Sequence, residues 1–98
     1  MALLNFRIKT DDTAWPDSRV ASFLTDYSIE VMPRTAEKVE NLRAILPSGT
    51  RVYIAHIDGT PIEEMVATAK RLASDGFQVM PHFPARIIKD EATLDDWI

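Results

Sequence analysis

Three short apolar runs recur along the chain, at residues 27–32, 52–57 and 77–83, and each leads into a polar group and then a helical pattern. The first two runs are rich in β-branched residues, which favours β-strands. The polar groups at or near the ends of the three runs are Glu30, His56 and His82. Strands alternating with helices at this spacing predict βαβ units and hence a parallel sheet.

The segment after the first strand has helical periodicity and predicts a helix over residues 35–46. Thr35 is its expected N-cap, and Pro47 ends it before a turn at Ser48 and Gly49. The expected buried stripe of this helix consists of Ala36, Val39, Leu42, Ile45 and Leu46.

The segment after the second strand carries the strongest helix signals in the chain. Thr60 is the expected N-cap, Pro61 the first helical residue, and Glu63 completes a T-x-x-E capping box. Gly76 stands where a left-handed residue ends a helix. The expected buried stripe consists of Ile62, Met65, Val66, Ala69, Leu72 and Ala73. After the third strand, Thr93 is expected to cap another helix.

Residues 1–26 precede this repeat and are expected to form a leader, with a short helix that begins near Asp17 or Ser18. Residues 27–98 form the predicted domain. We expect its intervening helices to cover one side of the sheet. If Glu30, His56 and His82 share the opposite side, they are joined there by the apolar side chains of Met32, Val52, Ile54 and Met80. Those side chains need a cover, which the remaining strands of a closed barrel would supply.

The fold expected from the sequence is therefore α/β, a parallel βαβαβ segment that forms the first strands and helices of a (β/α)8 TIM barrel, apparently truncated. In such barrels the chemistry lies at the carboxyl ends of the strands.

Composition narrows the choice of function. The net charge of −4 and the absence of a Lys/Arg cluster argue against binding to nucleic acid or to an anionic membrane. The chain has no cysteine, which excludes disulfides and thiolate chemistry. No apolar stretch approaches the ~20 residues that span a bilayer. We expect a soluble, cytoplasmic protein.

Glu30 is the main candidate for catalysis. A carboxyl flanked by Ile29, Val31 and Met32 would lose hydration, which favours its protonated form and suits it to donate a proton near neutrality. The alternative is a carboxylate that reaches solvent or pairs with Arg34.

His82 and His56 are the candidates for binding a cofactor. Pro81 and Pro84 restrict the backbone around His82, which helps to hold an imidazole against a ligand. His56 ends the second run and begins His56-Ile57-Asp58, an H-x-D pattern found in metal-dependent hydrolases. A turn before the Thr60 cap explains that pattern more simply, and no metal site is assigned.

The segment Ser28-Ile29-Glu30-Val31-Met32-Pro33-Arg34-Thr35 resembles the S-F-E-F-F-P-P-R-T signature of the methylenetetrahydrofolate reductase family. Met80-Pro81-His82-Phe83 resembles a P-H-L-T segment at the end of that family's third strand. Both motifs occur in the right order, so the resemblance covers residues 27–98.

The resemblance implies a flavin-bearing (β/α)8 barrel that takes part in one-carbon metabolism. It would pass a hydride from NAD(P)H through FAD to methylenetetrahydrofolate. It also implies that Glu30 is the general acid and that His82 contacts FAD. One proline of the first signature is missing, and the family's T-Y-G is replaced by Ala55-His56-Ile57, so the family assigns no role to His56.

Two other hypotheses follow from the residues. A non-catalytic α/β module would use its uncovered sheet face for self-association into a homo-oligomer. A metal-dependent barrel hydrolase would use His56, Asp58 and His82. The flavoprotein segment ranks first, and it is expected to be inactive as an isolated fragment because most flavin contacts would come from later strands.

Overall fold

The computed structural model describes residues 18–98. Residues 1–17, most of the predicted leader, lie outside the described residues. The short helix that the leader was predicted to contain is helix α1, Ser18–Phe23, which begins at one of the two predicted positions.

Three parallel strands form the sheet, in the order β1-β2-β3. They are β1 (Ser28–Val31), β2 (Arg51–Ile54) and β3 (Gln78–Pro81). Each strand lies beside the next one along the chain, which confirms the predicted α/β class and the βαβαβ order. The carboxyl ends of all three strands therefore meet at one edge of the sheet.

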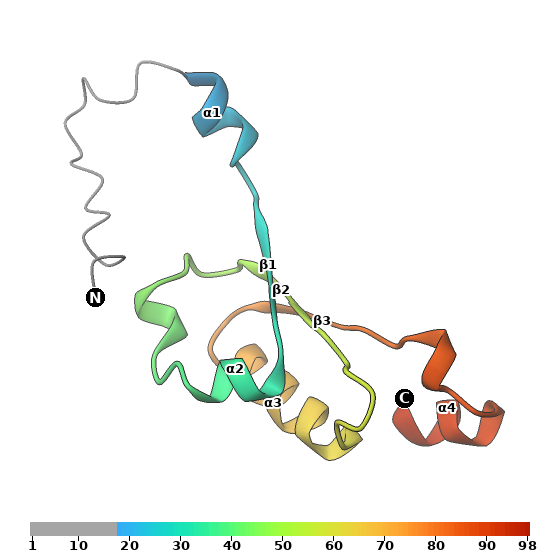
Figure 1. Cartoon of the computed structure of the whole chain (residues 1–98). Coiled ribbons are helices and arrows are strands. Elements are labelled where there is room, and N and C mark those ends of the chain that lie inside the picture. Colours follow the sequence, from blue (N-terminus) through green and yellow to red (C-terminus); the bar gives the residue numbers. More distant parts are fainter. Residues whose placement is uncertain (1–17) are drawn as a thin grey trace.

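The helices between the strands lie on one side of the sheet (Figure 1). Helix α2 (Pro33–Glu37) and a 3₁₀ turn, η2 (Leu42–Ala44), connect β1 to β2. Helix α3 (Ile62–Ser74) connects β2 to β3 and packs against both strands. No described element covers the other side, which we call the open face (Figure 1).

Register decides which side chains point to each side. Ile29, Val52 and Val79 pair across the sheet, as do Glu30, Tyr53 and Met80. Val52 and Ile54 are fully buried in the core. Because side chains alternate along a strand, Tyr53 lies on the open face with Glu30 and Met80. The expectation that Val52 and Ile54 lie on the open face is therefore wrong.

The core lies between β2, β3 and α3. Its buried members are Leu42, Val52, Ile54, Met65, Leu72 and Phe77. Of the predicted stripe on α3, Met65 and Leu72 are buried, whereas Val66 and Ala73 are exposed. The stripe is narrower than predicted because α3 contacts the sheet along one line of residues.

The single helix predicted over residues 35–46 is wrong. Helix α2 starts at Pro33 and ends at Glu37, and the chain resumes only as the turn η2. Thr35 does not cap the helix from outside. Its hydroxyl lies within the first turn, where it accepts a hydrogen bond from the Met32 amide at 3.0 Å.

Arg71 explains how the interrupted segment is held. Its guanidinium donates to the carbonyl of Ala36 at 2.7 Å, to that of Val39, and to that of Glu40 at 3.3 Å. Carbonyls at a helix end have no partner within the helix, and a planar group with several donors can satisfy more than one of them. The long-range contact with α3 thus replaces the helical hydrogen bonds that the sequence pattern predicted.

The two ends of α3 differ in how well they were predicted. At the start, Pro61 takes the N-cap position and no side chain caps the helix, so the predicted capping box is absent. At the end, Gly76 has φ +91°, as predicted for a left-handed residue. The amides of Gly76 and Phe77 donate to the carbonyls of Ala73 and Leu72, which forms a Schellman motif.

After β3, a 3₁₀ turn, η3 (Ala85–Ile87), leads to the last helix, α4 (Glu91–Trp97). Its N-cap is Asp90 rather than the predicted Thr93. The Asp90 carboxylate accepts from the Thr93 amide at 2.8 Å, and this hydrogen bond lowers the pKa of Asp90. Asp90 is the better cap because its side chain reaches the free amide from outside the helix.

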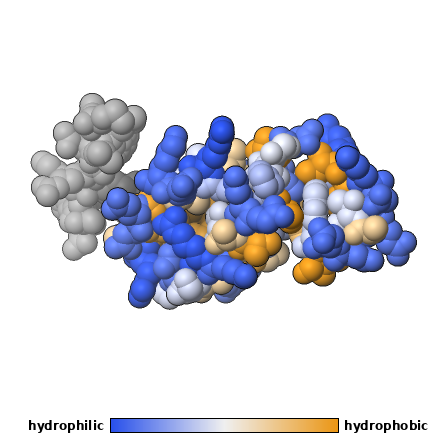
Figure 2. Space-filling view, turned by 90° about the horizontal axis from the view of Figure 1, so that it is seen from below, coloured by the Kyte–Doolittle hydropathy of each residue, from blue (hydrophilic) through white to orange (hydrophobic). Residues whose placement is uncertain are grey.

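Seen from the helical side, the surface is largely hydrophilic (Figure 2). Within residues 18–98, none of the helices is both long and apolar enough to span a bilayer.

Candidate functional site

Glu30 and His82 meet on the open face of the sheet. Glu30 comes from β1, and His82 directly follows β3. The Oε1 atom of Glu30 lies 3.2 Å from Nδ1 of His82, which is an ion-pair distance when the imidazole is protonated. The two candidates that sequence reasoning placed at the ends of the first and third strands are thus in direct contact, across the intervening strand β2.

Both groups remain accessible. The side chain of Glu30 is 57% exposed and that of His82 is 43% exposed. The dehydration expected for Glu30 from its apolar neighbours in sequence is therefore not present in the described residues, because Ile29 and Val31 point to the other side of the sheet and Met32 is itself exposed. The exposure of Glu30 fits the alternative of a carboxylate that reaches solvent, although its partner is His82 rather than Arg34.

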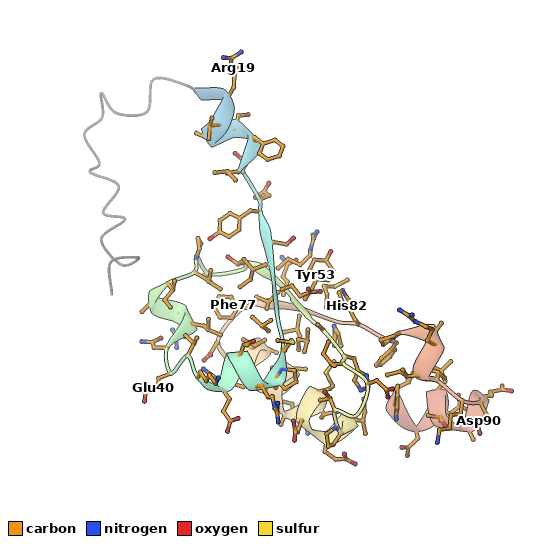
Figure 3. The ribbon with its side chains drawn as sticks, in the orientation of Figure 1. Arg19, Glu40, Tyr53, Phe77, His82 and Asp90 are labelled. Atoms are coloured by element: carbon orange, nitrogen blue, oxygen red, sulfur yellow. The ribbon has the colours of Figure 1, made fainter. Side chains whose placement is uncertain are left out.

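Tyr53 is the member of the site that sequence reasoning missed. Its ring lies beside the imidazole of His82, with centroids 5.3 Å apart and planes tilted by 42°. Figure 3 shows the two labelled side chains next to each other above the sheet. The alternation of Arg51, Val52, Tyr53 and Ile54 was the available signal, since it assigns the two aliphatic residues to the core and Tyr53 to the opposite face.

His56 lies on the other side of the sheet. It is only 6% exposed, and Nε2 is 3.0 Å from the carbonyl of Thr60. Its ring packs against Trp97 of α4 with centroids 4.9 Å apart. Because a carbonyl can only accept, the neutral ring carries its hydrogen on Nε2. The expectation that His56 shares a face with Glu30 and His82 is wrong, since its position shares the parity of Val52 and Ile54.

The positions of the two histidines also argue against the metal site of the hydrolase hypothesis. His56 and His82 end on opposite sides of the sheet, so the set proposed for a hydrolase, with Asp58, does not converge. Within the described range 18–98, no three His, Asp or Glu side chains cluster in a way that could hold a metal ion.

The open face therefore offers an acid–base pair beside an aromatic ring and an exposed thioether, Met80. A carboxyl and an imidazole in contact can share and transfer a proton near neutral pH. No protein-family model matches this chain.

The open face could form one wall for a planar ligand. Tyr53 and the exposed Met80 are paired in register and provide an apolar surface, and Nε2 of His82 has no partner within residues 18–98. A recess of about 410 Å³ lies between the loops that follow β1 and β2 and the start of α3, and neither Glu30 nor His82 lines it. The sequence contains no glycine-rich loop for binding phosphate, because its three glycines are isolated turn residues.

Proposed function

We propose that this chain supplies the first strands and helices of a (β/α)8 flavoprotein similar to methylenetetrahydrofolate reductase. The observation that carries the proposal is the 3.2 Å contact between Glu30 and His82. These residues belong to the two segments that resemble the family, and they are the two for which the resemblance implies a role. Their meeting on one face is what a shared site requires.

The arrangement of the elements supports a barrel. Sequential parallel strands with helices on a single side are the repeating unit of (β/α)8 folds. The opposite side holds Tyr53 and the exposed Met80. In a closed barrel further strands would cover these side chains and would bring additional ligand contacts to the site.

In this proposal the chain's own residues bind the ligand and handle a proton. Glu30 Oε1 lies 3.2 Å from His82 Nδ1, so a protonated imidazole would be within reach to return a proton to the carboxyl after Glu30 has donated one to the folate. His82 and the ring of Tyr53 would contact a flavin bound on this face. A bound FAD would supply the transfer of hydride from NAD(P)H to the folate. A cytoplasmic location accompanies this function.

The isolated chain is expected to bind little or no FAD, because it provides only one wall and no phosphate contacts. Titration of the purified chain with FAD, followed by flavin absorbance and fluorescence, checks this. The protein encoded by the complete reading frame that contains the chain is expected to bind FAD stoichiometrically. Tight binding by the 98-residue chain alone would contradict our account of the missing contacts, and no binding by the complete protein would contradict the proposed function.

A second candidate function is self-association through the open face, which the exposed side chain of Met80 beside Tyr53 favours. The purified chain would then elute as a dimer or larger species in size-exclusion chromatography with light scattering. Met80→Lys would shift it toward the monomer by placing a charge in the interface. An unmodified chain that stays monomeric at high concentration would eliminate this candidate.

A further inference from the structure

The contact between Glu30 and His82 has to pass over a strand. The two residues come from β1 and from the end of β3, and β2 lies between those strands. Neighbouring strands are about 4.8 Å apart, so the two backbones are separated by roughly twice that distance. Their side chains must therefore lean toward each other above β2, and what β2 presents there decides whether they can meet.

Two residues on β2 and directly after it, Tyr53 and Ala55, have side chains on the open face, between Glu30 and His82. Tyr53 pairs in register with Glu30 on one side and with Met80 on the other. The backbone ladder continues one step beyond the strands, since the amide of Ala55 donates to Val31 and the amide of His82 donates to Ile54. Ala55 therefore stands level with His82, on the same face as Tyr53.

These two residues do different things. The ring of Tyr53 lies against the imidazole, with centroids 5.3 Å apart, and limits how far the imidazole can tilt toward the amino ends of the strands. Ala55 contributes a single methyl group, which leaves open the path between the carboxyl and the imidazole. A branched side chain at position 55 would occupy that path.

We infer that Tyr53 and Ala55 are positioning residues for the contact between Glu30 and His82. The ring of Tyr53 supports the imidazole. The small side chain of Ala55 leaves the space in which the carboxyl and the imidazole meet. The catalytic meaning of this inference rests on the proposed function. The geometric claim does not, because it concerns only contacts among the chain's own side chains.

The test is a mutant cycle read by NMR on the full chain. At one pH near neutrality, we expect Glu30→Gln to change the ring chemical shifts of His82, because the substitution removes the charge beside Nδ1. The size of that change is then measured again in Tyr53→Phe, Tyr53→Leu and Ala55→Val backgrounds. Tyr53→Phe keeps the ring and should preserve the change, whereas Tyr53→Leu and Ala55→Val should reduce it roughly twofold or more.

Gln78→Ala is the matched control. Gln78 lies on the same face, one layer closer to the amino ends of the strands, and should leave the change intact. The full change in both the Tyr53→Leu and the Ala55→Val backgrounds would overturn the inference, as would a parent chain whose His82 shifts do not respond to Glu30→Gln. If Tyr53→Leu unfolds the chain, the Ala55→Val arm decides. Failure of FAD binding would leave these readouts unchanged, so the two proposals can fail separately.

Discussion

In a complete barrel with the proposed function, replacement of Glu30 by glutamine is expected to slow folate reduction by about 10²–10⁴-fold, the usual contribution of a general acid. Glutamine keeps the size and the hydrogen-bonding capacity of the side chain but cannot donate the proton that assists ring opening. Reduction of the flavin by NAD(P)H does not need that proton and should change little. Stopped-flow measurement of the two half-reactions separates these effects.

The matched control for this prediction is Glu37→Gln. Glu37 is an exposed carboxylate at the end of α2, and the same chemical change there should leave both half-reactions unaltered. If Glu30→Gln slows both half-reactions equally, Glu30 contributes to binding of the flavin and not to donation of the proton. Unchanged folate reduction would remove Glu30 from the mechanism.

Leu72→Ala is expected to lower the free energy of unfolding by about 2–5 kcal/mol, the range found for large-to-small changes in a packed core. Leu72 is fully buried in α3 and belongs to the cluster that joins this helix to β2 and β3. It also occupies the third residue from the end of the helix, where its carbonyl accepts from the Phe77 amide at 3.2 Å. Loss of the side chain removes apolar contacts to Phe77 at the Schellman motif as well as to the sheet.

Val66→Ala is the control for the stability measurement. Val66 lies on the same helix but is 41% exposed, although the sequence pattern placed it in the buried stripe. We expect a change of under about 1 kcal/mol, since little buried surface is lost and alanine is a better helix former. Urea unfolding of both variants provides the comparison. Equal costs for the two substitutions would show that α3 does not contact the sheet through the face described.

Local signals in the sequence predicted the elements that depend on short-range physics. Gly76 is an example, because a left-handed residue directly after a helix requires the backbone freedom of glycine. The helix over residues 35–46 could not be predicted correctly from periodicity. Its interruption depends on the guanidinium of Arg71, which binds the carbonyls of Ala36 and Val39 from a helix that lies more than thirty residues away in the chain.

The candidate site shows the same division. Glu30 and His82 were found from their positions at strand ends and from the two motifs, and the structure brings them together. Tyr53 was missed and His56 was misplaced, and both errors come from β2 alone. The sequence pattern assigned Val52, Ile54 and His56 to the opposite side of the sheet from the one they occupy.

The amino-acid sequence by itself determined the order of strands and helices, the parallel sheet, and the polar groups at the ends of the strands. Only the tertiary structure decided which side of β2 faces the helices. A shift of one residue reverses every side chain of a strand, and a run such as Val52–Ile57 is apolar enough to satisfy either choice. Packing of Val52 and Ile54 against α3 resolves that choice, because it buries two aliphatic side chains and leaves the ring of Tyr53 beside His82.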